Sequence, residues 1–308
     1  MGGFLDALGG RLAERWLSLL VLPGAVYLAV AATAATLGQG HALDVPRLVR
    51  HVTRYAASPQ VTSGGAQVVL LAAVLLGAAV LGLAARAAGA VLERLALGAG
   101  WRRWPRPWST LARRTVVRRR DRWHRAHARW HREWRAARAP RPADRPDPAA
   151  RHRAAHHRDR IAVERPDRLT WSGDRVHAAA LRLGRDSHLD LAVVWPHLWL
   201  SLPDTVRAEV TAGRDALARA AGLGAWALLY APLAPWWWPA APLAAVLALT
   251  ARSRFRAATD TYASLLEAAT RLHAPALATQ LGIAHEGVLD PRLGRRLTDL
   301  LGNRLPPP

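Results

Sequence analysis

Three long runs without a formal charge stand out from the otherwise Arg-rich pattern of hydrophobic and polar positions. They hold 28, 31 and 32 residues and lie between Arg15 and Asp44, between Arg54 and Arg86, and between Arg219 and Arg252. A helix crosses a bilayer with about 20 mostly apolar residues, so the first two runs predict single spans at 16–38 and 67–92. The apolar part of the first run is longer than the roughly 7–15 residues of a signal-peptide core, which favours an uncleaved span.

The third run predicts a helical hairpin rather than one span. As a single helix its 32 residues would measure about 48 Å, whereas the hydrocarbon core of a bilayer is ~30 Å thick. Prolines interrupt its middle, where Trp236, Trp237 and Trp238 also lie, and Trp prefers the membrane–water interface. We therefore expect two antiparallel arms within 216–251 and a Trp-capped tip at the far interface. A shallow re-entrant hairpin and a single tilted span are the alternatives.

Charge is distributed unevenly along the 308 residues. All 43 basic residues are Arg, and the 22 Asp and Glu leave a net charge of +21. Residues 101–160 alone hold 20 Arg and five acidic residues, a net +15, whereas the 39–66 loop is only mildly basic. The positive-inside rule places the Arg-rich segment in the cytoplasm and the 39–66 loop outside. With a hairpin, both termini are then cytoplasmic, in a multi-pass protein of the cell membrane.

Segment 93–139 combines Arg with regularly spaced Trp. A helix is expected from about 110 to 139, with three Trp on one face, and this face is expected to contact the membrane, a partner or the chain's own helices. The residues expected to bind anionic lipid or a partner are Arg102, Arg103, Arg113, Arg114, Arg118, Arg119, Arg120, Trp123, Trp130 and Trp134. The residues expected to anchor the chain at the interface are Trp101, Trp104, Trp108, Trp236, Trp237 and Trp238.

Two segments of different character follow the Arg- and Trp-rich helix. Residues 140–168 are rich in Pro, Arg and His and are expected to form an extended or disordered linker. The cytoplasmic segment 169–215 is expected to be helical, with Ser172 capping one helix and Asp190 capping the next. Pro203 fits the first turn of the helix that leads into the hairpin.

The two ends of the chain are expected to be cytoplasmic and helical. Residues 1–15 predict an amphipathic N-terminus. Residues 252–308 keep helical spacing, and Asp290-Pro291 predicts the start of a last short helix before a Pro tail. The fold class expected is therefore an all-α integral membrane protein with four transmembrane helices, two separate spans plus a C-terminal hairpin, and a helical cytoplasmic domain.

A motif of about 30 residues precedes the hairpin. It runs from Gly173-Asp174 to Leu202-Pro203, and its central residues are Asp190, Trp195, Pro196, His197, Trp199 and Pro203. This pattern resembles one in uncharacterised bacterial multi-span membrane proteins, which have Trp-Pro-Arg-Leu-Trp or a close variant before an apolar hairpin. The resemblance implies the architecture alone, because that family has no activity to transfer.

The composition excludes much of catalytic chemistry. The chain has no Cys and no Lys, so thiolate nucleophiles, thiolate metal sites and Lys-based mechanisms are excluded. His124, His127 and His131 share a helix face, but the surrounding Arg would repel a metal dication. We expect no catalytic residues, no cofactor and no metal. Part of the Arg excess reflects coding bias, because the missing Lys and the rarity of Asn and Ile are typical of GC-rich sequences.

These observations predict a non-enzymatic membrane protein whose basic cytoplasmic region binds anionic lipid headgroups or a protein partner. It would act as a membrane scaffold, an accessory subunit or a membrane-perturbing effector, as a homo-oligomer or with a partner protein. One alternative is a channel or transporter subunit, although acidic groups are absent from the expected spans. A second is a membrane-tethered nucleic-acid binder through residues 101–160.

Overall fold

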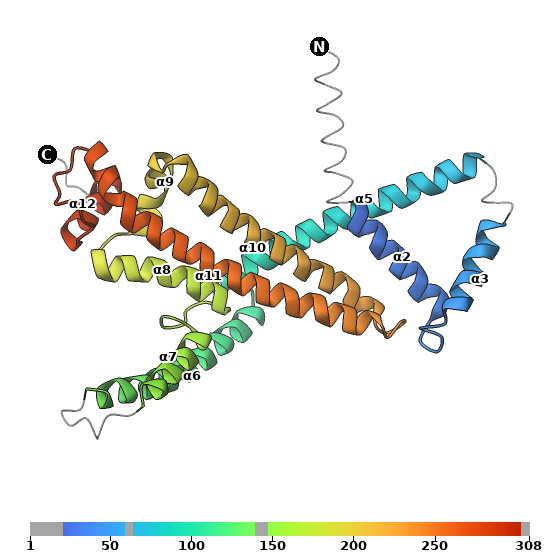
Figure 1. The fold of residues 1–308 in the computed structure, drawn as a ribbon, viewed down its shortest axis with the longest axis horizontal. Coiled ribbons are helices and arrows are strands. Elements are labelled where there is room, and N and C mark those ends of the chain that lie inside the picture. The colour runs from blue at the N-terminus through green and yellow to red at the C-terminus, as the bar shows by residue number, and fades with distance from the viewer. Residues whose placement is uncertain (1–20, 59–63, 139–146, 303–308) are drawn as a thin grey trace, which may run out of the picture. The chain divides into compact units, whose positions relative to one another are not determined.

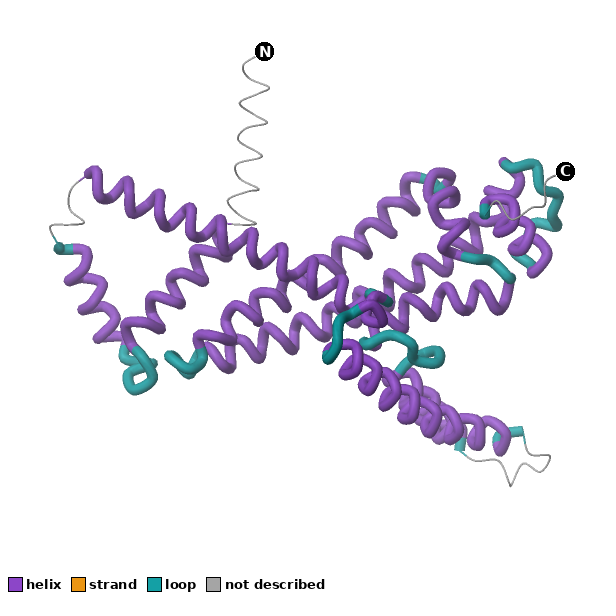
Figure 2. The backbone as a smooth tube through the Cα atoms, turned by 180° about the vertical axis from the view of Figure 1, so that it is seen from behind, coloured by secondary structure: helices purple, strands orange, loops and turns teal. Residues whose placement is uncertain are grey.

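The computed structural model describes residues 21–58, 64–138 and 147–302, and within these ranges the chain is helical and contains no strand (Figures 1 and 2). The expected all-α class is therefore confirmed. The helices in chain order are α2 (Leu22–Leu37), α3 (Val45–Ala56), α5 (Gly64–Leu97), η2 (Gly100–Arg103), α6 (Trp108–Ala136), α7 (Pro148–Ile161), α8 (Trp171–Ser187), α9 (Leu191–Ser201), α10 (Asp204–Tyr230), η4 (Ala231–Leu233), α11 (Ala240–Gln280) and α12 (Pro291–Leu301).

The chain divides into two compact units. Unit 1 consists of Met1–Leu92 and Ala218–Ser253, and unit 2 consists of Glu93–Leu217 and Arg254–Pro308. Two helical stretches, Gly64–Leu97 and Asp204–Leu233, are long and apolar enough to cross a membrane. The expected first span lies partly outside the described residues, and its described part is the shorter apolar helix α2. The expected fourth span is the apolar start of the much longer helix α11.

Unit 1 is held together by close approaches between helices that bear small residues. Gly24 of α2 lies so near α5 that an added Cβ would be 2.7 Å from the carbonyl carbon of Ala78. Gly89 of α5 similarly faces the backbone of Gly222 in α10. Ala78 is fully buried. Small residues allow two helix backbones to approach without a cavity, so the Gly- and Ala-rich face of α5 determines where its neighbours cross.

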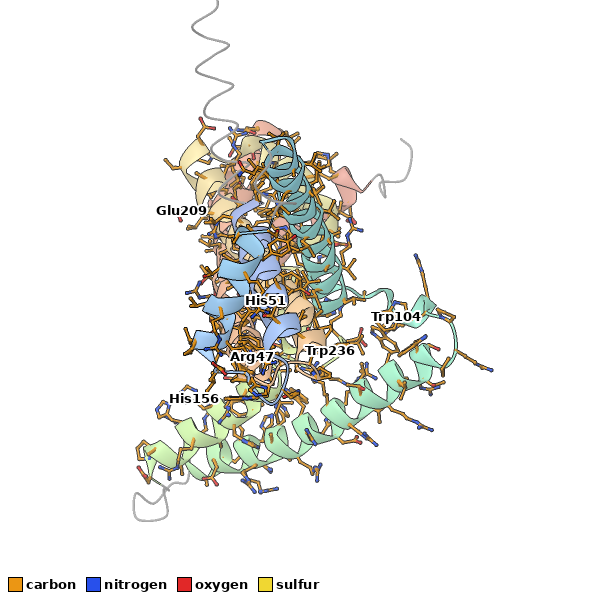
Figure 3. The ribbon with its side chains drawn as sticks, turned by 90° about the vertical axis from the view of Figure 1, so that its right-hand side faces the viewer. Arg47, His51, Trp104, His156, Glu209 and Trp236 are labelled. Atoms are coloured by element: carbon orange, nitrogen blue, oxygen red, sulfur yellow. The ribbon has the colours of Figure 1, made fainter. Side chains whose placement is uncertain are left out.

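The ends of the helices in unit 1 are joined by hydrogen bonds between two loops. The Gln39 side chain donates to the carbonyl oxygens of Ala234 and Pro235, at 2.9 and 2.6 Å. The Trp237 indole donates to the Ala42 carbonyl at 2.9 Å. The loop after α2 therefore lies beside the turn between α10 and α11. The 39–66 loop also contains a helix, α3, which carries Arg47 and His51 one turn apart (Figure 3).

Unit 2 has its hydrophobic core where α9, α12 and the C-terminal part of α11 meet. The most deeply buried aliphatic side chains there include Val194, Leu198 and Leu297. Helix α8 joins this core, and Arg175 of α8 donates to Asp260 of α11 at 2.6 Å. These contacts fix α8 and α9, the helices that carry the sequence motif.

The helix caps in unit 2 follow the expected chemistry with one correction. Asp190 caps α9 and Asp290 caps α12, with side-chain oxygens that accept backbone N–H groups. Thr170, rather than Ser172, caps α8, because its hydroxyl accepts from Gly173 N at 3.0 Å and also donates to the carbonyl of Ala96. Ser172 lies inside the helix instead.

The segment expected to be an extended or disordered linker, 140–168, contains helix α7. Asp147 caps this helix by accepting the Ala149 N–H, and Pro148 occupies its first turn, where a missing N–H costs nothing. The linker prediction is therefore wrong for 148–161, and residues 139–146 lie outside the described ranges. The expected N-terminal segment 1–15 also lies outside them.

Candidate functional site

The basic arm, which we define as α6 and α7, is a pair of helices packed side by side (Figures 1 and 2). The face of α6 toward α7 buries Ala112, Val116, Trp123 and Ala126. The indole of Trp123 donates to the carbonyl of Ala162 at 2.9 Å. Trp123 was expected to bind lipid or a partner; in the structure its ring is 7% exposed and is part of the packing within the arm.

The two other Trp of this face also contact neighbours within the arm. The guanidinium of Arg158 on α7 lies 4.4 Å from the ring centroid of Trp130, and that of Arg138 lies 3.6 Å from the ring of Trp134. Cation–π contacts of this kind contribute about 0.5–1 kcal/mol at exposed sites. Of the three environments expected for the Trp face, the structure therefore shows packing within the same chain.

Three of the predicted lipid-binding arginines hold η2 and α6 to the loop before α8. Arg119 forms an ion pair with Asp174 at 2.8 Å and donates to the carbonyls of Ile161 and Arg168. Arg120 donates to the Pro166 carbonyl at 2.8 Å and pairs with Asp167. Arg102 pairs with the same carboxylate at 2.8 Å. These contacts stabilise the fold; Arg119 is mostly buried, whereas 63% of the Arg102 side chain remains exposed.

Asp174 is the centre of this contact. Only 3% of its side chain is exposed, and its Oδ1 accepts the backbone N–H groups of Asp167 and Arg168, each at 2.8 Å. Burial raises the pKa of the Asp174 carboxyl, while these N–H groups and Arg119 oppose the rise. Burial also lowers the pKa of Arg119. Both shifts report the cost of removing the two charges from water, which their contact offsets.

The face of α6 opposite Trp123 carries a row of exposed arginines, which we call the arginine stripe. At 100° per residue, its members lie within about 80° of one another around the helix and extend over ~27 Å. The stripe consists of Arg114, Arg118, Arg122, Arg125, Arg129 and Arg132, all of them exposed. The last four were missed by the sequence analysis, although their spacing relative to the Trp face would have placed them together. Arg103 and Arg113 are exposed outside the stripe.

The predicted interfacial Trp residues have different environments. Trp101 is half-buried, and its indole donates to the Asp167 carbonyl at 3.3 Å. Trp104 is also half-buried, whereas Trp108 is 62% exposed. At the turn of unit 1, Trp236 and Trp238 are exposed, and Trp237 points to the Ala42 carbonyl. Of these six residues, Trp108, Trp236 and Trp238 therefore have rings exposed enough to contact a membrane interface.

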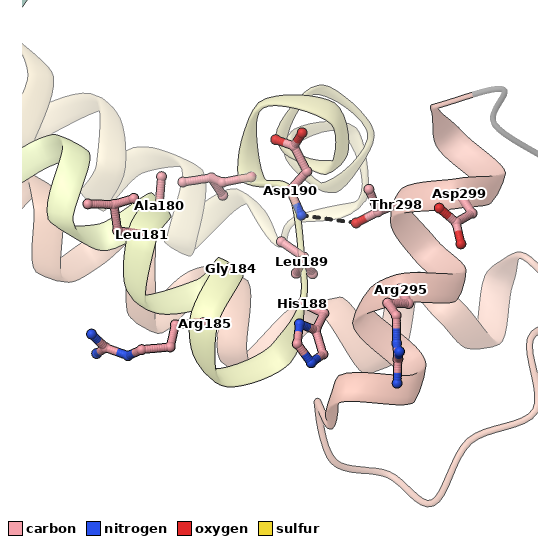
Figure 4. A pocket seen from close by; sticks show the side chains of 11 residues that line it. Ala180, Leu181, Gly184, Arg185, His188, Leu189, Asp190, Arg295, Thr298 and Asp299 are labelled. Atoms are coloured by element: carbon pink, nitrogen blue, oxygen red, sulfur yellow. Dashed lines mark hydrogen bonds between the residues drawn. The ribbon is translucent and has the colours of Figure 1, made fainter.

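The residues of the sequence motif are used mainly for packing around α9. Asp190 caps the helix, and its own N–H donates to the Thr298 hydroxyl at 3.0 Å (Figure 4). Trp195 and Trp199 lie one turn apart with ring centroids 5.8 Å from each other. Pro196 lies inside α9 and His197 is exposed on it, while Pro203 directly precedes α10.

No family model matches the chain, and neither the curated proteins nor the solved structures contain a significant match. The site must accordingly be interpreted from its own geometry. A cavity of about 550 Å³ lies beside Asp190 and includes Arg185, His188 and Arg295 in its lining (Figure 4). It also includes Asp299, so charges of both signs line an open surface.

The clustered His residues of α6 are part of the aromatic packing. The His127 ring stacks on Trp123 with centroids 4.4 Å apart, and His131 contacts His127 edge-on. Burial, followed by the nearby His131 and Arg158, lowers the pKa of His127. Among the residues that the structure describes, no group of three or more His, Asp or Glu is arranged to hold a metal ion.

Proposed function

We propose that this chain is a multi-pass protein of the bacterial inner membrane that binds anionic lipid headgroups through the arginine stripe and acts, without catalysis, as a membrane scaffold or accessory subunit. The observation that carries the proposal is the stripe itself, six exposed arginines on the face of α6 opposite its packed Trp face. A phosphate-rich surface is a partner that such a row can contact along its whole length.

The membrane part of the proposal is supported by the surface of unit 1. Large aliphatic side chains are exposed along α5, and Val68 and Leu76 are each 68% exposed. The apolar surfaces of α2 and α11 are also exposed, for example at Val26 and Leu249. Contiguous apolar surface of this extent is rare on proteins in water and is stabilised by contact with lipid chains.

The proposal includes four spans with both termini in the cytoplasm, and the two loops of unit 1 support it. Because Gln39 and Trp237 join the loop after α2 to the turn after α10, both loops lie at one end of the unit. The opposite ends of α5, α10 and α11 continue into unit 2, which carries most of the charge. The positive-inside rule then favours the cytoplasm for unit 2 and the outside for the turn.

The arginine stripe contains enough charges for a substantial electrostatic attraction to an anionic membrane. Each Arg near an anionic leaflet contributes about 1 kcal/mol, so six provide at most roughly 6 kcal/mol. Salt reduces this attraction, because exposed charges are screened beyond a Debye length of about 10 Å at 0.1 M. Binding should therefore depend on both anionic lipid and low ionic strength.

The absence of Cys from the chain makes lipid contact directly measurable. A single Cys at Ala128, an exposed position beside the stripe, is labelled with an environment-sensitive dye in the full-length protein. In nanodiscs containing phosphatidylglycerol we expect a blue-shifted emission that lipid-borne quenchers reduce. In phosphatidylcholine nanodiscs, or at about 0.5 M salt, this signal should be weak.

Matched triple substitutions test whether the stripe is responsible. R118Q/R122Q/R125Q should abolish most of the signal in anionic nanodiscs. R292Q/R295Q/R296Q removes the same charge from the exposed face of α12 and should leave the signal unchanged. Equal loss in both variants, or equal emission in neutral and anionic lipid, would refute the proposal. Salt-sensitive binding of single-stranded RNA with the same dependence on the stripe would favour nucleic acid as the ligand.

Topology is tested separately with single Cys residues and a membrane-impermeant maleimide in intact cells. We expect Cys at Gly40 and at Trp236 to react, and Cys at Ala208 and at Ala284 to react only after permeabilisation. Different accessibility of Ala208 and Ala284 would mean a single span instead of the hairpin.

A further inference from the structure

A second cavity, of about 340 Å³, lies within unit 2 between α8, α9 and α11. Its walls are mostly apolar and include Val176, Trp195 and Leu266. Three polar side chains also line it, namely Arg168, His177 and Tyr262. Apolar cavities with a few converging polar groups are typical of small-molecule sites, and their volumes range from about 300 to 1,000 Å³.

Arg168 brings a positive charge to this cavity, and within the described residues it forms no ion pair with a carboxylate. Its Nε is buried without a hydrogen-bond partner, and its Nη2 lies 3.4 Å from the Nδ1 of His177. The carboxylates of Asp167 and Asp174, in the same loop region, are paired with the arginines of η2 and α6. A partly buried cation without a counter-charge is costly, so an anion in the cavity would offset a penalty that the empty protein retains.

The two other polar side chains of the lining, His177 and Tyr262, carry groups that can donate hydrogen bonds. Burial, and then the charge of Arg168, lowers the pKa of His177, so that the ring is neutral at pH 7. With Nδ1 accepting from Arg168, the ring proton is on Nε2. Burial also raises the pKa of Tyr262, which keeps its phenol protonated. The lining of the cavity therefore contains one cation and two neutral side chains that can donate hydrogen bonds.

We propose that this cavity binds a small organic monoanion, a carboxylate attached to a short acyl or aryl body. A carboxylate matches the planar fork of a guanidinium, and its single charge balances the single charge of Arg168. A phosphate group, with a charge of about −1.5 to −2 at pH 7, would leave excess negative charge. The apolar body would lie against Trp195 and Leu266. The proposal is independent of lipid binding by the arginine stripe.

Calorimetry with the full-length protein in zwitterionic nanodiscs tests the proposal, with empty nanodiscs as the baseline. The probes are phenylacetate and hexanoate, and the analogues are neutral phenylacetamide and cationic phenethylamine. We expect saturable binding of at least one carboxylate, at least tenfold weaker binding of phenylacetamide, and no binding of phenethylamine. Lack of saturable binding by both carboxylates, or equal affinity for phenylacetamide, would overturn the proposal.

Two variants locate the site. R168Q removes the charge while keeping the backbone contacts of residue 168, and should weaken binding at least tenfold. A192F fills the cavity from α9 and should abolish binding. This second variant tests the site independently of whether R168Q folds. R165Q, an exposed neighbour outside the lining, is the control and should bind as the parent does. Undiminished affinity in A192F or in a folded R168Q, or loss of affinity in R165Q, would contradict the assignment.

Discussion

Replacing Asp174 with Asn should destabilise unit 2 by about 3 kcal/mol. Removing one partner of a buried ion pair costs roughly 3–5 kcal/mol, and Asp174 is only 3% exposed. We use the lower end of this range because Arg119 is 16% exposed and keeps two carbonyl acceptors after Asp174 is replaced. Asn also keeps an oxygen for the two backbone N–H groups that Asp174 Oδ1 accepts. Ala would lose this acceptor as well, at about 1–3 kcal/mol for each N–H.

Thermal unfolding of the full-length protein in nanodiscs, followed by near-UV circular dichroism, measures the effect. With about 2–4 °C per kcal/mol for a unit of this size, D174N should lower Tm by roughly 6–12 °C, and D174A should lower it further. The control is D121N, an exposed carboxylate on α6 whose loss should cost under ~0.5 kcal/mol. A D174N variant as stable as D121N, or equal to D174A, would refute this account of the Asp174 contact.

Three further outcomes are expected from thermal unfolding under the same conditions. Gly24→Leu should lower Tm by several degrees because its side chain meets the backbone of α5, whereas Gly65→Leu has open space and should change Tm little. Acid should destabilise the basic arm: burial lowers the pKa of His127 in the folded chain, so the unfolded chain binds this proton first as pH falls below about 6.5. His127→Phe keeps the stacking and should reduce that loss, and an unchanged pH profile would contradict the assignment. Thr170→Ala should cost about 1 kcal/mol as the loss of an N-cap, while Ser172→Ala should cost less; the reverse order would restore Ser172 as the cap.

Much of the helical pattern could be predicted because its signals are local. The turn between α10 and α11 follows from clustered Pro and Trp, and Asp190 and Asp290 precede their helices as expected. Asp147-Pro148 is the same start signal as Asp290-Pro291, yet the surrounding Pro and Arg obscured it. Helix α7 lacks a strong apolar face of its own, so its order depends on contact with the Trp face of α6. The local sequence of α7 does not indicate this contact.

The candidate site was harder to predict because its arginines have two different roles. Arg118 and Arg119 are adjacent in the sequence, but one is exposed and the other pairs with Asp174, 55 residues further along. Their environments differ because the loop before α8 folds onto the side of α6 that carries Arg119. The cavity beside Arg168 could not be found from the sequence either, because α11, which is far from α8 and α9 in the chain, completes its walls.

Coding bias changes how many arginines a chain contains, but it does not determine on which side of a helix they lie. In α6 the side toward α7 is occupied by Trp123 and its neighbours, so the arginines there are limited to those that reach carbonyls or a carboxylate. The opposite side has no such requirement, and there six arginines lie in one row. Two adjacent positions can thus differ in environment, with one guanidinium paired within the fold and the next exposed. The net charge of +21 does not distinguish paired from exposed arginines. The environment of each guanidinium depends on its position on α6 relative to the Trp face.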